Sequence, residues 1–116
     1  MSNTVHITYK ELKPNKEATH LRVEVYYSKG GINYFTYNNE KRGYYVQVSP
    51  VIREERGGCT IETYAAFSGY KRLVKETSKK LGKKAEEAIV DASALTIGSL
   101  VEAVLTKNEL ELADNQ

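Results

Sequence analysis

Apolar and polar residues alternate along much of the first 67 residues, which is the pattern of β-strands that bury one face. In the clearest run, Leu21, Val23, Val25 and Tyr27 share one face and polar residues or tyrosine occupy the other. Similar runs cover residues 5–12, 32–37, 44–49 and 59–67. The pattern therefore predicts four to five strands within residues 5–67.

Short turn signals separate these runs. Ser28-Lys29-Gly30-Gly31 supplies two glycines for a tight hairpin between residues 21–27 and 32–37, and residues 38–43 form a second turn. Pro50 is expected to interrupt or bend the third strand, because proline has no N–H for the ladder. Since the connections are short, the strands are predicted to form an antiparallel meander.

The spacing of apolar residues becomes helical after Ser68, which is placed to cap a helix. This spacing predicts a basic helix over residues 68–95, either continuous or broken at Gly82. Ser99-x-x-Glu102 resembles a capping box and predicts an acidic helical tail over residues 96–116. The expected fold is of the α+β class: one domain over residues 1–116, with a four- to five-stranded antiparallel meander, a basic helix and a C-terminal helical extension.

The net charge of +2 conceals a strong asymmetry. Residues 63–84 contain seven Lys or Arg and only one acid, Glu76, whereas residues 85–116 contain Lys107 and seven acids. A basic segment of this kind favours a polyanion as partner, and the acidic segment favours either the chain's own basic surface or a neighbouring subunit.

The residues that usually carry catalysis or bind metals are sparse. Cys59 is the only cysteine, so no intramolecular disulfide or cysteine-rich zinc site can form, and a reducing, cytoplasmic location is expected. Cys59 itself is expected to be a small buried hydrophobe. His6 and His20 are the only histidines, and no ligand spacing for a metal appears. The sequence therefore predicts no enzyme, no cofactor, no metal site and no membrane span.

Aromatic rings mark the face of the sheet that is expected to point away from the helix. The chain has nine Tyr, and the alternation places several of them on that face beside polar residues. Bases of a single strand stack on such rings while nearby cations contact phosphates. The predicted nucleic-acid-binding residues are Tyr26, Lys29, Phe35, Tyr37, Lys41, Arg42, Tyr45, Lys71 and Lys75.

Two other interpretations stay open. Tyrosine is a good strand former, so a Tyr-rich face can be purely structural or can pair with a second copy in a homodimer. The chain can also be a protein-interaction module, an accessory or inhibitor protein, that docks through the sheet face or the C-terminal helix and binds no nucleic acid.

A family resemblance bears on this choice. The stretches Tyr26–Gly31, Asn33–Thr36 and Lys41–Val48 resemble the ββββα pattern of PUR repeats and the related Whirly-type domains. The resemblance covers residues 21–81 and implies binding of single-stranded DNA or RNA on a curved sheet and pairing of two units. It does not cover residues 85–116. The run Arg42–Pro50 also resembles small proteins of bacterial phages and mobile elements, which implies no function.

Overall fold

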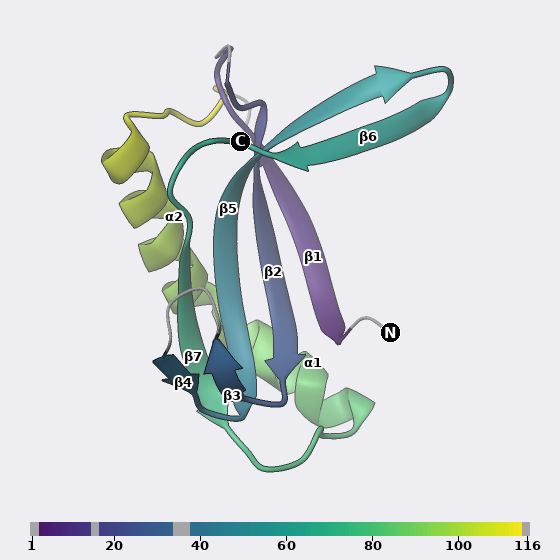
Figure 1. Cartoon of the computed structure of the whole chain (residues 1–116), viewed down its shortest axis with the longest axis vertical. Helices are drawn as coiled ribbons and strands as arrows, with labels where there is room; N and C mark the ends of the chain where they lie inside the picture. The colour runs from purple at the N-terminus through teal and green to yellow at the C-terminus, as the bar shows by residue number, and fades with distance from the viewer. Residues whose placement is uncertain (1–2, 15–16, 34–37, 115–116) are drawn as a thin grey trace.

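A computed structural model describes residues 3–14, 17–33 and 38–114 of the chain. The order of elements confirms the α+β class, with an antiparallel sheet followed by two helices (Figure 1). Within the described residues the elements are β1 (Thr4–Glu11), β2 (His20–Ser28), β3 (Gly31–Asn33), β4 (Asn38–Glu40), β5 (Gly43–Arg56), β6 (Cys59–Tyr64), β7 (Tyr70–Glu76), α1 (Lys83–Ala92) and α2 (Ala94–Asn108).

The long strand β5 organises the main sheet, in which all pairs are antiparallel. One edge of β5 pairs with β2, which in turn pairs with the edge strand β1. The other edge pairs first with β7, through residues 43–48, and then with β6, through residues 51–56. β6 and β7 pair with the same edge of β5, one before and one after residues 65–69, so the chain bends at these residues. Residues 51–64 leave the body of the sheet as a projecting hairpin, named the arm (Figure 1).

Pro50 marks the base of the arm without breaking β5. The residue is fully buried and lies opposite Leu21 of β2. Its carbonyl oxygen accepts a hydrogen bond of 3.1 Å from the backbone N–H of Ala65. The missing N–H of proline is therefore tolerated at the point where the pairing of β5 changes from β7 to β6.

The predicted hairpin between residues 21–27 and 32–37 is wrong. β2 pairs along its length with β5, whereas β3 pairs with β4 in a separate two-stranded ribbon. Gly30 and Gly31 adopt φ angles of 74° and 102°, so the chain turns out of the main sheet at this point. Residues 34–37 of the expected return strand lie outside the described residues.

The helix predicted from Ser68 is also wrong in its first part. Residues 70–76 form the strand β7, and α1 begins only at Lys83. Tyr70, Leu73 and Val74 fit a helical spacing. In the structure they belong to a strand, and a bulge opposite Tyr44 and Tyr45 accommodates that spacing. The free edge of β5 gains its ladder of hydrogen bonds this way. Likewise α2 begins at Ala94, so Ser99 lies inside that helix and is not its cap.

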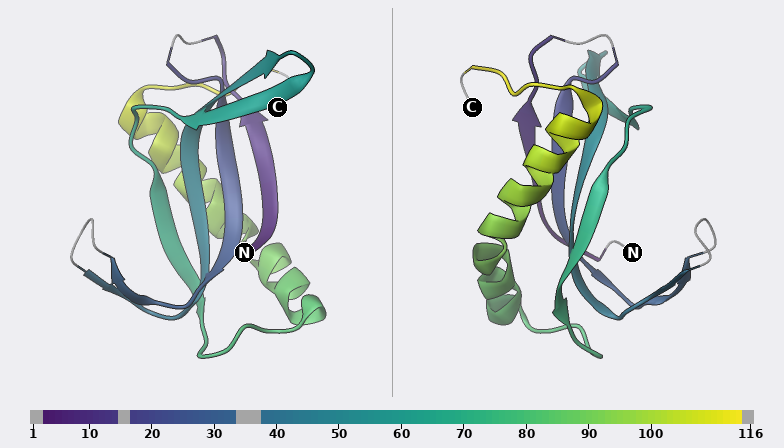
Figure 2. Two further views of the ribbon diagram at one scale, coloured as in Figure 1. Left: turned by 45° about the vertical axis from the view of Figure 1, so that its right-hand side comes forward. Right: turned by 90° about the vertical axis from the view of Figure 1, so that its left-hand side faces the viewer.

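The core lies between one face of the sheet and α2. Leu100, Val101 and Val104 of α2 are buried against the apolar residues of β2 and β5. Both helices lie on this side of the sheet, and the ribbon of β3 and β4 projects on the other (Figure 2). The sheet face opposite the helices is named the outer face.

The C-terminal segment is attached to the N-terminal part of the chain. Leu110 is buried, Leu112 forms an isolated β-bridge with Leu12, and Glu111 pairs with Lys13 at 3.0 Å. The acidic tail therefore does not cover the lysines of residues 79–84.

Neither helix by itself has the length and apolar composition to cross a membrane in the part of the chain that the structure describes. Taken together α1 and α2 would meet those criteria, but they are bent by 52° at their junction.

Candidate nucleic-acid interface

Alternation along β2 and β5 brings polar and aromatic side chains together on the outer face. The register places Tyr26 opposite Tyr45 and Glu24 opposite Gln47, with Arg22 further along the same side of β2. The arm and the ribbon of β3 and β4 leave the sheet at opposite ends (Figure 1). The outer face therefore lies between two projecting hairpins.

The arm is held to the sheet through Glu62. The hydroxyl of Tyr9 donates to one carboxylate oxygen of Glu62 at 2.5 Å, and Nη1 of Arg22 donates to the other at 2.8 Å. The guanidinium of Arg53 lies 3.9 Å from the centroid of the Tyr9 ring. Burial by itself would raise the pKa of Glu62, but the bonds from Tyr9 and Arg22 outweigh it and hold that pKa below its usual value. Both arginines are therefore committed to holding the arm.

Tyr26 and Tyr45 stack on each other next to this cluster. Their ring centroids lie 5.7 Å apart and their planes differ by 17°. Only 6% of Tyr45 is exposed, and its hydroxyl donates to the carbonyl of Lys41 at 2.7 Å. Nζ of Lys71 lies 5.6 Å from the Tyr45 ring and forms an ion pair with Glu40. Tyr45 is thus a packed ring of the sheet, and Tyr26 is the half-buried member of the pair.

Arg42 ties together three segments at the end of the sheet where β2 ends and β5 begins. Nε of Arg42 donates to the carbonyl of Lys29 at 2.9 Å, and its Nη1 donates to the carbonyl of Ser78 at 3.2 Å. The backbone N–H of Thr77 bonds to the carbonyl of Arg42 at 3.1 Å. These contacts join residues 28–30, 40–43 and 75–84, which together are named the basic end.

Tyr44 anchors the lysine-rich loop of the basic end from inside the core. Its hydroxyl donates to Oε2 of Glu86 at 2.5 Å and accepts from the N–H of Leu81 at 2.9 Å. Nζ of Lys80 binds the same carboxylate oxygen at 2.7 Å. Burial, reinforced by the bond to Glu86, raises the pKa of Tyr44 to about 12. The loop is therefore held in a defined position by a buried neutral hydroxyl.

Most of the cations at the basic end form no ion pair with an acid among the residues that the structure describes. Lys41 lies 3.9 Å from Glu76, and Lys80 is paired with Glu86. No ion pair within the described residues involves the other cations of this end and of the adjoining first turn of α1, which are Lys29, Arg42, Lys75, Lys79, Lys83 and Lys84. The C-terminal acids Glu111 and Asp114 contact Lys13. The segment that follows α2 lies at the opposite end of the molecule from the loop between β7 and α1 (Figure 1). An excess of positive potential therefore remains at one end.

The predicted site residues fall into two neighbouring groups. Tyr26, Tyr45 and Lys71 lie together on the outer face, whereas Lys29, Lys41, Arg42 and Lys75 belong to the basic end. Phe35 and Tyr37 lie outside the described residues. The candidate list missed Lys79, Lys83 and Lys84. The concentration of lysines in residues 63–84 could have identified them. They were left out because the helix predicted over this segment would place them on an ordinary solvent-exposed face.

Cys59 contradicts its expected burial, because it is exposed at the tip of the arm. No group of three or more His, Cys, Asp or Glu suited to a metal ion occurs among the residues that the structure describes.

Comparison of the chain with protein-family models, curated proteins and solved structures finds no match.

Proposed function

We propose that this protein binds single-stranded DNA or RNA, with the phosphates on the basic end and the strand continuing onto the outer face beside Tyr26. The observation that carries the proposal is the group of six cations at one end of the molecule that form no ion pair within the described residues. They come from three segments far apart in the sequence, which Arg42 and Tyr44 hold together.

The chemistry of the basic end suits phosphate. Arg42 has five N–H donors and uses two of them on backbone carbonyls, so others stay available for an anion. Lysines supply mobile point charges that follow a flexible backbone. Neutralising several phosphates releases counterions from the strand, which is the main source of affinity in such complexes.

The single-stranded form is favoured by the aromatic pair beside the basic end. Tyr26 is half-buried and packs one face on Tyr45, so a base could stack only on what remains accessible of the Tyr26 ring. The proposal thus assigns Tyr45 the role of support for Tyr26 rather than that of a stacking platform. Lys71 borders this pair.

A fluorescence anisotropy titration tests the proposal. A labelled oligonucleotide of about 15 thymidines should bind at about 50 mM salt, and the logarithm of the affinity should fall with the logarithm of salt concentration with a slope of about −3, as expected for four or five phosphates. A flat salt dependence, or no binding with protein at about 100 μM, would reject it. The predicted homodimer stays a prediction, which sedimentation of the free protein checks.

A further inference from the structure

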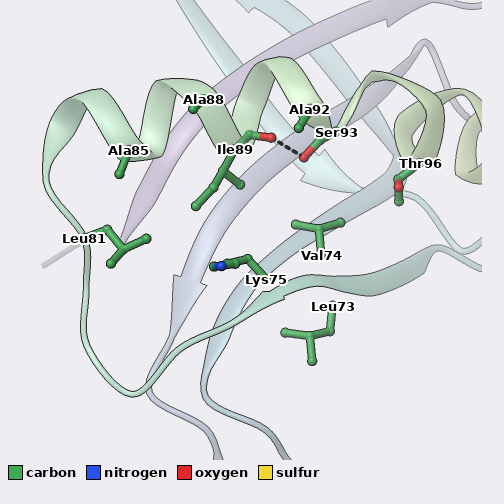
Figure 3. A pocket seen from close by; sticks show the side chains of 10 residues that line it. All are labelled: Leu73, Val74, Lys75, Leu81, Ala85, Ala88, Ile89, Ala92, Ser93 and Thr96. Atoms are coloured by element: carbon green, nitrogen blue, oxygen red, sulfur yellow. Dashed lines mark hydrogen bonds between the residues drawn. The ribbon is translucent and has the colours of Figure 1, made fainter.

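A groove of about 560 Å³ lies between α1 and the strand β7, away from the outer face (Figure 3). Its walls are mainly apolar: Val74 comes from β7, Leu81 from the loop, and Ala85, Ala88, Ile89 and Ala92 from α1. Figure 3 shows Ile89 extending from α1 towards β7, with Ala85 on the same side of the helix. Among the described residues that line the groove, Lys75 alone is charged.

The chain itself covers the apolar side of α1 only in part: Ile89 and Val90 pack against the core and are half-buried. None of the residues of α1 is buried, and Ala85, Ala88 and Ala92 are exposed. A helix of ten residues normally owes its stability to packing of such a face, because isolated helices of this length are marginal in water. The groove therefore presents an apolar helix face and an apolar strand with room for another element between them.

The charges around the groove define its occupant. Lys75 is part of the lining, and Lys79 and Lys84 belong to the loop and the first turn of α1 on either side of Leu81, which also lines the groove. The acids of α1 lie elsewhere: Glu86, Glu87 and Asp91, together with Lys83, line a separate hollow that faces β1. An element with apolar side chains on one face and carboxylates along its flank matches this arrangement.

We propose that the groove between α1 and β7 is a docking site for an acidic amphipathic helix of a partner protein. The apolar face of that helix lies against Val74, Ala88 and Ile89, and its carboxylates lie over the lysines at the Leu81 end. The apolar lining of this groove is not part of the proposed nucleic-acid site. Lys75 belongs both to the groove and to the basic end.

A second copy of the chain fits the groove less well. A symmetric pairing of two grooves would supply no carboxylate to Lys75, because none of the described residues that line the groove is acidic. The helix that precedes the acidic C-terminal segment is α2, and its apolar residues Leu100, Val101 and Val104 are already buried in the core. Nucleic acid, in turn, offers no aliphatic face for the alanines and Ile89.

Two labelled peptides test the proposal by fluorescence anisotropy. One is a helix-forming peptide of about 16 residues with Leu and Ala on one face and Glu on the other, and the second carries Lys in place of Glu. The acidic peptide should bind, and the basic peptide should bind at least about tenfold more weakly. Ala88→Glu should weaken binding of the acidic peptide by at least about tenfold, because it puts a carboxylate into the groove.

Ala94→Glu is the matched control, since Ala94 is an exposed helical alanine outside the groove lining. It should change peptide affinity by less than about twofold. Both variants should keep the circular dichroism spectrum and bind the thymidine oligonucleotide like the unmodified protein, which separates failure at the groove from failure of the nucleic-acid site.

Three outcomes would overturn the proposal. The first is no saturable binding of the acidic peptide up to about 100 μM protein, and the second is equal affinity for the two peptides. The third is a dimer in sedimentation that Ala88→Glu converts to a monomer, because the groove would then be filled by a second copy.

Discussion

Glu62 on β6 and Arg22 on β2 are joined by a 2.8 Å hydrogen bond between residues forty positions apart in the sequence. Their side chains are 19% and 22% exposed, so the pair is largely shielded from water. Glu62 also accepts a hydrogen bond from the hydroxyl of Tyr9, and its Oε1 lies 3.4 Å from Nε of Arg53. This one carboxylate therefore sets the direction in which the arm leaves the sheet.

Replacing Glu62 with Gln should destabilise the protein by about 1–3 kcal/mol, because Arg53 then keeps its charge without this carboxylate and Arg22 keeps only its pair with Glu24. Urea denaturation followed by circular dichroism measures the loss. Glu54→Gln is the control, since Glu54 forms a more exposed pair with Arg56 on the same arm. That change should cost less than about 1 kcal/mol. Equal losses for the two variants would show that Glu62 does not fix the arm.

Tyr45 should contribute to the stability of the fold rather than contact nucleic acid directly. Tyr45→Ala removes a ring that is 6% exposed and should cost about 3–5 kcal/mol, whereas Tyr45→Phe loses only the bond to the Lys41 carbonyl and should cost about 1 kcal/mol. Tyr64→Ala removes a ring that is 63% exposed, so its cost should stay within about 0.5 kcal/mol. Thermal melts of the three variants rank them, and a Tyr45→Ala protein as stable as Tyr64→Ala would contradict this role.

Gly43 lies where β2, β5 and β7 meet at the basic end. A Cβ atom added there would sit 2.2 Å from the carbonyl oxygen of Lys75 and 2.9 Å from Cα of Glu76. Gly43→Ala should therefore push β7 away from β5 and cost about 1–3 kcal/mol or more. Gly98→Ala should instead stabilise α2 by about 0.5–1 kcal/mol, because nothing lies within 4 Å of that position. Denaturation midpoints that move in the same direction for both variants would contradict the close approach.

The hydroxyl of Tyr44 gives stability a dependence on alkaline pH. Its pKa is raised to about 12 from an ordinary value of 10.0, so the folded state holds this proton more tightly than the unfolded state does. The resulting stability is complete below pH 10 and is lost as pH rises from there towards 12. The difference in unfolding free energy between the unmodified protein and Tyr44→Phe should therefore be constant up to about pH 9 and shrink at about pH 11. A difference that grows with pH would reverse the assigned shift.

Local patterns in the sequence predicted the parts of the fold that depend on alternation. The runs at residues 5–12, 21–27 and 59–67 match β1, β2 and β6, and the side of β2 that carries Tyr26 is the outer face. Pairing was harder to predict because it depends on distant partners. Gly30 and Gly31 suggest a hairpin, but the longer apolar ladder between β2 and β5 is the more stable pairing.

The candidate site was predicted only in part, because it too depends on contacts between distant segments. Tyr70, Leu73 and Val74 carry a spacing that suits a helix, and only the open edge of β5 and the bulge in its pairing make them a strand. Once β7 is a strand, Lys79 and Lys80 lie in a loop at the end of the sheet, and Lys83 and Lys84 lie in the first turn of α1. Their anchoring by Tyr44 and Arg42 joins residues from separate segments, which no local pattern records.

We propose that phosphates of a single strand bind to the cations of the basic end that form no ion pair in the part of the chain that the structure describes. Lys83→Glu and Lys107→Glu test it as a matched pair, because both reverse an exposed helical lysine that forms no ion pair within the described residues, at opposite ends of the molecule. Lys83→Glu also places an acid in the first turn of α1, which favours the helix.

The most direct measurement is the affinity of these two variants for a labelled thymidine oligonucleotide at about 50 mM salt. Lys83→Glu should weaken binding by about tenfold and make the salt dependence less steep, whereas Lys107→Glu should change affinity by less than about twofold. Equal affinities for the two variants, with both proteins folded, would contradict the account.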